Sequence, residues 1–151
     1  MSGHALVARL DNAGDVLLSG PAVRAVRAGA DRVTYLCGER GRAAARLLPG
    51  VDEVLVRSAE WIDPDPRPVA RPSVDAFVDE LGARSIDVAV VLTSFHQSPL
   101  PLALLLKMAG VPHVVGIGVD YPGSLLDVRV QVEDRQRRRQ RLPRSQVEVG
   151  R

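Results

Sequence analysis

The stretch HALVARLDNAGDVLLSGPAVRAVR, residues 4–27, decides how the chain is predicted to fold. Residues 5–10 form a short apolar run with the length of one buried strand. A polar turn follows, and from Asp15 onward apolar residues return at helical spacing. The chain therefore opens with a strand, a tight turn and a helix. This order places Asp15 near the helix N-terminus, above the carboxyl end of the strand, where open α/β sheets bind ligands.

The alternation of strands and helices continues to residue 117. The apolar run at residues 87–92 is uninterrupted, which is typical of a parallel strand covered on both faces. The alternation predicts an α/β fold, a Rossmann-like parallel sheet of five strands in the order 3-2-1-4-5 with helices on both faces. Further strands are predicted at residues 32–37, 51–56 and 113–117, and further helices at residues 40–48, 73–82 (with Ser73 as N-cap) and 99–109.

The length of 151 residues suits one domain, which we place at residues 1–128. Apolar residues make up 46% of the chain but aromatic residues only 3%, so the core must consist of Leu, Val, Ile and Ala. Residues 61–72 are rich in proline, which predicts a surface loop where Trp61 either lines a cleft or pins the loop to the domain. Residues 129–151 are basic and lack an apolar pattern, so we expect a disordered tail.

Two interpretations of Asp15 follow from the residues alone. Aspartate is common in the first turn of a helix, and Asp11, Asn12 or Asp15 can simply cap this one, which the spacing by itself favours. Alternatively, a carboxylate at this edge can act as a base when it is positioned against a hydroxyl group. In both cases the helix N-terminal amides and the macrodipole favour the ionised carboxylate.

A second group of polar residues follows the strand predicted at residues 87–92. That strand neighbours the first strand across the predicted switch point of the sheet, so we expect this group and Asp15 to face one crevice. An ordinary polar connection between strand and helix is equally consistent with the residues. The group consists of Thr93, Ser94, His96, Gln97 and Ser98.

Several kinds of site are not predicted. Gly116 and Gly118 follow the last predicted strand instead of the first and lack a third glycine, so no dinucleotide-binding loop is expected. The three histidines are scattered without metal-ligand spacing, so we expect no metal site. A single cysteine, Cys37, excludes an intrachain disulfide.

Charge and hydropathy also bear on location and partners. A net charge of +2 is too small to indicate a nucleic-acid partner for the whole chain. Arg9 and Asp11 interrupt the N-terminal apolar run, so no signal peptide is evident. Prolines and polar residues break the uncharged segment at residues 88–106, which argues against a membrane span. We therefore expect a cytoplasmic protein.

The opening stretch resembles the N-terminal signature of family 9 glycosyltransferases, the ADP-heptose:lipopolysaccharide heptosyltransferase family. The matching residues are Gly14, Asp15, Ser19 and Pro21. The resemblance continues through GRAAARLLPGVDEVL (41–55) and IDVAVVLTSFHQSPLPLALLLKMAGVPHVVGI (86–117). It covers roughly the first 128 residues in the order expected of the family.

The resemblance implies the N-terminal, acceptor-side domain of a glycosyltransferase B fold, in which two Rossmann-like domains face one cleft. It implies inverting transfer of a sugar from a nucleotide-sugar to a glycan or glycolipid acceptor without a metal or other cofactor. By the resemblance, Asp15 is the catalytic base. It also implies peripheral association with the inner face of a membrane. The implied acceptor-binding residues are Asn12, Gly14, Ser19, Thr93, Ser94, His96, Gln97 and Ser98.

The polar group departs from the family pattern Asp-x-Gln-Gly-x-x-Lys-Ser. Only Ser98 matches, whereas Val91, Thr93, Ser94 and Gln97 replace Asp, Gln, Gly and Lys. The loss of the lysine removes a phosphate-binding charge. The sequence therefore argues against a phosphorylated lipopolysaccharide core as acceptor.

The resemblance ends before the donor-binding half of the family. We therefore expect a truncated enzyme that is inactive alone and meets the nucleotide-sugar only with a C-terminal half. The alternative function is a non-catalytic Rossmann-like binding module or remnant. The arginine-rich tail leaves three interpretations open: a solvated end, a segment that binds phosphates of nucleic acid or anionic lipid, or a sequence that no longer encodes family structure.

Overall fold

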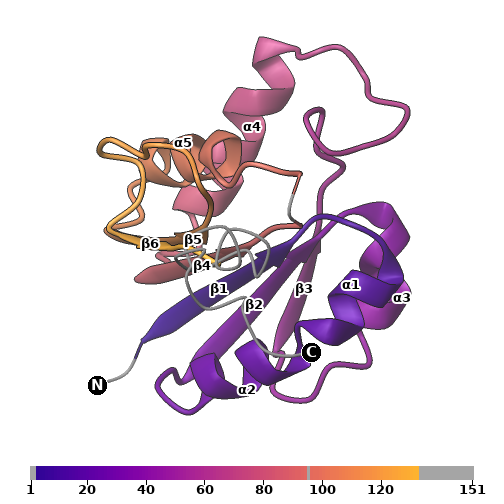
Figure 1. The fold of residues 1–151 in the computed structure, drawn as a ribbon, viewed down its shortest axis with the longest axis vertical. Helices are drawn as coiled ribbons and strands as arrows, with labels where there is room; N and C mark the ends of the chain where they lie inside the picture. Colours follow the sequence, from indigo (N-terminus) through magenta and orange to yellow (C-terminus); the bar gives the residue numbers. More distant parts are fainter. Residues whose placement is uncertain (1–2, 95, 133–151) are drawn as a thin grey trace, which may run out of the picture.

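The computed structural model describes residues 3–94 and 96–132, which form one parallel sheet covered by helices (Figure 1). The strand order is β3-β2-β1-β4-β5-β6, and every neighbouring pair is parallel. The predicted order 3-2-1-4-5 is therefore confirmed, with one additional strand at the edge. The strands are β1 (His4–Arg9), β2 (Arg32–Cys37), β3 (Glu53–Val56), β4 (Val88–Leu92), β5 (His113–Ile117) and β6 (Val128–Val130).

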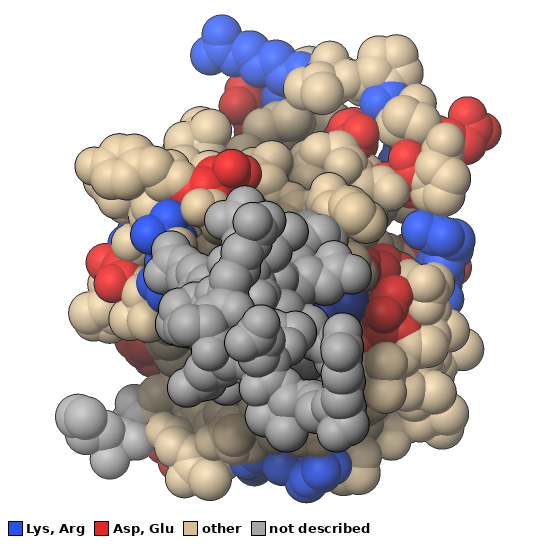
Figure 2. All heavy atoms as spheres, viewed as in Figure 1, with Lys and Arg blue, Asp and Glu red and all other residues tan. Residues whose placement is uncertain are grey.

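Helices cover both faces of the sheet, as predicted. One face carries α1, α2 and α3 together with the short 3-10 turn η1, and the other carries α4 and α5 (Figure 1). Acidic and basic side chains are interspersed on the face that Figure 2 shows. The helices are α1 (Ala13–Leu18), α2 (Gly20–Arg27), η1 (Glu39–Gly41), α3 (Arg42–Ala45), α4 (Arg71–Gly82) and α5 (Leu100–Met108).

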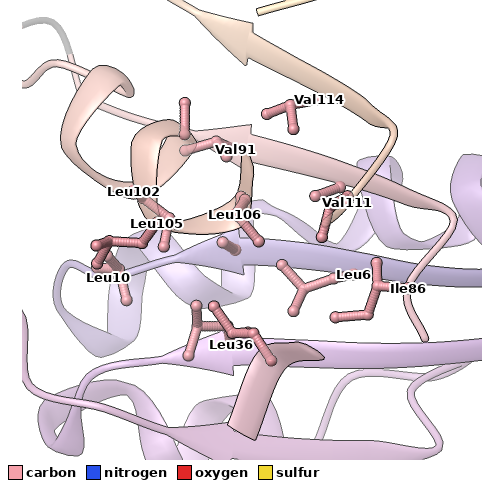
Figure 3. Packing of buried hydrophobic residues seen from close by; sticks show 14 of the residues in the cluster. Leu6, Leu10, Leu36, Ile86, Val91, Leu102, Leu105, Leu106, Val111 and Val114 are labelled. Carbon is pink, nitrogen blue, oxygen red and sulfur yellow. The ribbon is translucent and has the colours of Figure 1, made fainter. Parts of the chain in front are cut away.

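Strand β1 divides the core into two layers. Successive side chains of a strand point to opposite faces, so Leu6 packs under α4 and α5 whereas Val7 packs under the other helices. Both side chains are fully buried. Figure 3 shows Leu102 and Leu106 of α5 among the side chains of the first layer, to which Leu6 also belongs. Aliphatic side chains dominate both layers, as the low aromatic content predicted.

The helix predicted after Asp15 is broken at Ser19, which ends α1 and precedes α2. The Ser19 hydroxyl donates a hydrogen bond to the Val16 carbonyl at 2.6 Å and lies 2.6 Å from the Tyr35 hydroxyl. Pro21 lies in the first turn of α2, where its missing N–H costs nothing. The hydrogen bond from the Ser19 hydroxyl to a backbone carbonyl of the preceding turn, together with Pro21, explains why two short helices form instead of one.

Other boundaries also differ from the prediction. Helix α4 begins at Arg71 after Ala70 as N-cap, so Ser73 does not cap it. Pro72 lies in its first turn, where proline is tolerated. The helix predicted at residues 40–48 is reduced to η1 and α3.

The prediction of five strands was wrong by one, because β6 extends the sheet. Val115 of β5 pairs with Val128, and Ile117 pairs with Val130. The sheet therefore includes Arg129 and Val130, which lie beyond the predicted end of the domain at residue 128. Residues 133–151, the rest of the predicted tail, lie outside the described residues. Within the described part of the chain, none of the helices has the length and apolar character needed to cross a membrane.

Candidate functional site

The candidate site lies at the carboxyl ends of β1 and β4, which are adjacent in the sheet. The last residue of β1, Arg9, pairs with Leu92 at the end of β4. After β1 the chain turns directly into α1, and Asn12 caps that helix by accepting a hydrogen bond from the Asp15 backbone N–H at 3.0 Å. Asp15 is therefore in the first turn of α1, at the sheet edge where the sequence predicted it.

Arg9 is the centre of the polar contacts at this edge. Its Nη2 atom lies 3.2 Å from Asp11 Oδ2 and 3.2 Å from Asp15 Oδ1, and it donates a hydrogen bond to Ser94 Oγ at 2.9 Å. The Ser94 hydroxyl in turn donates to Asp11 Oδ2 at 2.5 Å. One guanidinium group therefore joins two carboxylates and the loop after β4.

The two carboxylates differ in exposure. The Asp11 side chain is 5% exposed and Arg9 is 16% exposed, whereas Asp15 is 27% exposed. Asp11 is therefore the inner partner of Arg9, and Asp15 is the partner that a ligand can reach. Counting one cation and two anions, the three side chains carry a formal charge of −1.

Two buried polar atoms in this network have no hydrogen-bond partner among the described residues. They are Oδ1 of Asp11 and Nε of Arg9. Buried polar atoms usually have a protein or water partner. Asp11 also lines a small cavity beside the network, so its Oδ1 is a candidate acceptor for a hydroxyl group or a water molecule.

The same cavity brings the loop after β4 together with the proline-rich loop. Trp61 and Ile62 form part of its apolar wall and also pack against the core, so Trp61 both lines a cavity and anchors its loop. The sequence left open whether Trp61 lines a cleft or anchors its loop, and in the structure it does both. The polar lining consists of Asp11, Thr93, Gln97 and Ser98.

Most polar groups of this loop are engaged in holding it in place. Thr93 Oγ1 donates to the Ile117 carbonyl at 2.8 Å, which ties the loop to β5. Ser98 Oγ accepts from the Leu100 N–H at 3.2 Å at the start of α5. Gln97 Oε1 accepts from the Ser94 N–H at 3.2 Å. His96 is exposed beside them.

Ser19 lies apart from this group. Ser19 is 5% exposed, and its hydroxyl contacts Val16 and Tyr35 inside the core layer under α1 and α2. Burial raises the pKa of Tyr35 to about 12, although the hydrogen bond with Ser19 acts in the opposite direction. The Tyr35 phenol is therefore neutral and serves as a structural partner of Ser19.

Arg9 and Asp11 were not predicted as site residues. The sequence contains a signal for Arg9, because a charged residue at the carboxyl end of an otherwise apolar strand must find a partner. Its partner Ser94 is 85 residues away in the sequence, which no local pattern can identify. For metals, the described residues contain no group of three His, Cys, Asp or Glu side chains that could hold an ion.

No family model matches the chain, and no curated protein matches it by sequence. Solved structures with a similar fold include two glycosyltransferases. The structure of E. coli ADP-heptose LPS heptosyltransferase II matches 90% of this chain and 36% of its own, with a TM-score of 0.65 and 21% identity. The family 9 glycosyl transferase from Veillonella parvula matches 88% of this chain and 37% of its own, with a TM-score of 0.62 and 18% identity.

The match confirms the fold that the resemblance implied. It extends over nearly all of this chain but over little more than a third of either solved structure. The described residues of the chain thus form a Rossmann-like domain with the fold of one domain of these family 9 glycosyltransferase structures.

Proposed function

We propose that this chain is the acceptor-side domain of a glycosyltransferase, with Asp15 as the general base. The observation that carries the proposal is the placement of Asp15. A partly exposed carboxylate lies at the carboxyl edge of the sheet, on a capped helix turn and against the Arg9 guanidinium. The fold match to two family 9 structures supports the same reaction class.

The proposed reaction is an inverting substitution at the anomeric carbon of a nucleotide-sugar. Asp15 accepts the proton of an acceptor hydroxyl while that oxygen forms a bond to the anomeric carbon. The bond from that carbon to the nucleotide diphosphate breaks, and the diphosphate leaves with the electron pair. Its developing negative charge requires fixed cationic or hydrogen-bonding groups, which we assign to a donor-binding domain outside this chain.

Arg9 acts in this proposal as a positioning residue. Its single Nη2 atom holds Asp15 and Ser94 at the same time, and therefore fixes the carboxylate relative to the loop after β4. Asp11 balances the charge of Arg9 from the buried side. A base that is held in one orientation loses little entropy when the acceptor hydroxyl meets it.

The proposed acceptor contacts surround this network. Gln97 is the clearest donor among them, because its Oε1 is occupied by Ser94 and its amide N makes no hydrogen bond to another described residue. The loop contains no lysine, so we propose a neutral sugar surface as the ligand on this side. The acceptor-binding residues we propose are Asn12, Gly14, Thr93, Ser94, His96, Gln97 and Ser98. Ser19 stays a prediction from the resemblance, and its buried hydroxyl lends it no support.

A second candidate function is a non-catalytic binding module with the same fold. The observation in its favour is the extent of the match, which leaves about two thirds of each solved structure without a counterpart in this chain. Both candidates predict acceptor binding near Asp15. Only the first predicts that Asp15 is needed for turnover once a donor-binding domain is supplied.

The two candidates can be separated with the chain and a supplied donor-binding half. We expect no transfer from nucleotide-sugars by the chain alone. When the chain is joined to the donor-binding half of the E. coli heptosyltransferase, we expect turnover that Asp15→Asn lowers at least about 100-fold. The matched control is Asp79→Asn, on the exposed side of α4, which should leave turnover unchanged.

Acceptor binding is measured separately by titrating the labelled chain with neutral oligosaccharides and following backbone amide shifts. Shifts confined to residues 12–15 and 93–98 support the acceptor site in both candidates. Turnover by the chain alone that is lost in Asp15→Asn would show that no second domain is needed. Turnover of the joined protein that is unaffected by Asp15→Asn would contradict the base assignment.

A further inference from the structure

The small cavity beside the Arg9 network is lined by two side chains with unused hydrogen-bonding capacity. Oδ1 of Asp11 is buried and has no hydrogen-bond partner among the described residues, and the Asp11 side chain is only 5% exposed. Gln97 uses its Oε1 atom for a bond with Ser94, and its amide nitrogen donates to no other described residue. Asp11 and Gln97 both line the cavity. The site therefore offers one charged acceptor and one neutral donor.

Ser94 contacts both of these side chains and fixes them relative to each other. Its hydroxyl donates to Oδ2 of Asp11 at 2.5 Å, and its backbone N–H donates to Oε1 of Gln97 at 3.2 Å. Each bond uses one end of the carboxylate or of the amide and leaves the other end available. A ligand that meets both available atoms therefore loses little free energy in ordering them.

Trp61 forms part of the apolar lining of the same cavity, and its loop is held by Arg57. Arg57 Nη2 donates to Oε1 of Glu60 at 3.0 Å, and Nη1 donates to Oγ of Ser73 on α4 at 3.0 Å. The Arg57 guanidinium also lies over the Phe77 ring, 4.8 Å from its centroid. The Arg57 and Glu60 side chains are 15% and 8% exposed. Because Glu60 directly precedes Trp61, this buried ion pair makes the indole a preformed wall of the cavity.

The size and lining of the cavity limit which group can enter. Its free volume is about 10 Å³, close to the space that one water-sized oxygen needs. Leu10, Val91 and Leu102 are among its apolar lining residues (Figure 3), so an unpaired charge would be costly there. A phosphate or carboxylate group would also be repelled by the Asp11 carboxylate.

A hydroxyl group fits these limits better than other small groups. It donates one hydrogen bond, which suits Oδ1 of Asp11, and accepts another, which suits the amide nitrogen of Gln97. An ammonium group has no lone pair with which to accept from Gln97. The available donor and acceptor together therefore select an uncharged group that has both functions.

We propose that this cavity is a subsite for one hydroxyl group of a neutral acceptor sugar. The hydroxyl donates to Asp11 Oδ1 and accepts from Gln97 Nε2, while the apolar side of the sugar ring lies against Trp61. The inference rests on the proposed function and deepens it, because it adds Asp11 and Trp61 to the acceptor contacts. Arg9 contacts both Asp11 and Asp15, so a sugar anchored at Asp11 can place another of its hydroxyls near the candidate base.

The subsite predicts a specificity as well as a location. An acceptor that lacks the anchored hydroxyl leaves Asp11 Oδ1 unpaired, and sites built to bind a hydroxyl reject such analogues strongly. An acceptor with a phosphate at this position is excluded by size and by charge. The subsite thus favours a neutral sugar over a phosphorylated one.

Trp61 is the only tryptophan of the chain, so its fluorescence reports binding at this cavity. The full chain is titrated with the methyl glycosides of glucose, galactose and mannose. We expect a saturable change in Trp61 emission with at least one of them, whereas inorganic phosphate should neither change the emission nor compete. Among the monodeoxy derivatives of the glycoside that binds, the one without the anchored hydroxyl should bind at least about tenfold more weakly.

Two variants test the polar contacts from the protein side. In Asp11→Asn, the amide oxygen replaces Oδ2 as acceptor for Arg9 and Ser94, so the amide nitrogen offers the hydroxyl a second donor in place of its acceptor. Asp11→Asn and Gln97→Ala should each weaken binding of the glycoside about tenfold. The matched controls are Asp79→Asn and Gln131→Ala, two exposed positions where the affinity should change by less than about twofold.

The sugar derivatives and the variants can be combined into one cycle. If the anchored hydroxyl donates to Asp11, the derivative that lacks it should bind Asp11→Asn and the parent chain about equally. Circular dichroism shows which variants are folded. Gln97 is half-buried and lies in a loop, so Gln97→Ala and the deoxy sugars test the subsite even if Asp11→Asn does not fold.

Three results would overturn the subsite. They are the absence of a Trp61 response to all three glycosides, unchanged affinity in folded Asp11→Asn and Gln97→Ala, and competition by phosphate. Binding that depends on Asp11 and Gln97, without transfer by the protein joined to a donor-binding half, would count only against the proposed reaction. Transfer by the joined protein with an acceptor KM that neither variant changes would count only against the subsite.

Discussion

Arg9 and Asp15 form an ion pair across the turn between β1 and α1, with Nη2 of Arg9 3.2 Å from Oδ1 of Asp15. The same nitrogen lies 3.2 Å from Oδ2 of Asp11, which is almost fully buried. The candidate base is thus held by a cation that is itself neutralised from inside the protein. Arg9 therefore contributes both to the position of the candidate base and to the stability of the domain, and these two contributions can be measured separately.

Arg9→Met should destabilise the domain by about 3 kcal/mol or more, because the buried carboxylate of Asp11 loses its counter-charge. Urea unfolding followed by circular dichroism measures this free energy. Arg71→Met is the matched control, since Arg71 is 91% exposed and its pair with Asp75 should contribute less than about 1 kcal/mol. Adding Asp11→Asn to Arg9→Met should restore part of the loss, because it removes the unpaired charge. Equal losses for Arg9→Met and Arg71→Met would contradict the buried pair.

Ser19→Ala should destabilise the domain by about 1–3 kcal/mol, because it leaves the buried Tyr35 hydroxyl without its partner. Removing both hydroxyls, with Ser19→Ala and Tyr35→Phe, should cost less than the sum of the two single changes. Additive losses would show that the two hydroxyls do not interact. Ser19→Ala should leave oligosaccharide binding unchanged, and weaker binding by a variant that remains folded would support the acceptor role implied by the resemblance.

The stability of the domain should fall in acid partly through Glu53. The hydrogen bond from Arg84 holds the pKa of Glu53 below its ordinary value, against the opposing effect of burial, and Arg32 adds to the lowering. A lowered pKa in the folded state stabilises the protein above the unfolded pKa, and this contribution is lost as the pH falls through the folded pKa. Glu53→Gln should therefore be less stable than the parent at pH 7, and the difference should shrink from about pH 5 downward.

Unfolding in urea at a series of pH values tests this expectation for Glu53. The matched control is Asp79→Asn, whose difference from the parent should stay small and independent of pH. A constant difference between Glu53→Gln and the parent across the acid range would show that the ion pairs of Glu53 do not contribute.

Cys37 should be unreactive in the folded protein. Burial, with a smaller contribution from the nearby Glu39 carboxylate, raises the pKa of its thiol to about 11, against the lowering effect of Arg42. Only the thiolate reacts with disulfide reagents, so both the pKa and the inaccessible position protect it. A thiol assay at pH 8 should give no rapid reaction in buffer and one thiol per chain in urea. Rapid reaction of the folded chain would mean that β2 opens locally.

Local patterns were sufficient for the framework of the sheet. The continuous apolar run at β4 and the alternation of strands and helices along the chain predicted parallel strands in the observed order. The polar turn after β1 predicted that Asp15 begins a helix at the carboxyl edge, because a helix start depends on a few neighbouring residues. The same patterns missed β6, since a three-residue strand with all residues exposed shows no burial pattern to detect.

What the sequence by itself determined is therefore the type and order of the elements and the position of Asp15 among them. The tertiary structure alone decided that Arg9 joins Asp11, Asp15 and Ser94, because this contact depends on the register between β1 and β4. It also decided that Ser19 faces Tyr35 inside the domain. Helix and strand periods act over a few residues, whereas a hydrogen-bond partner is chosen by whichever chain segment the folded sheet brings within about 3 Å.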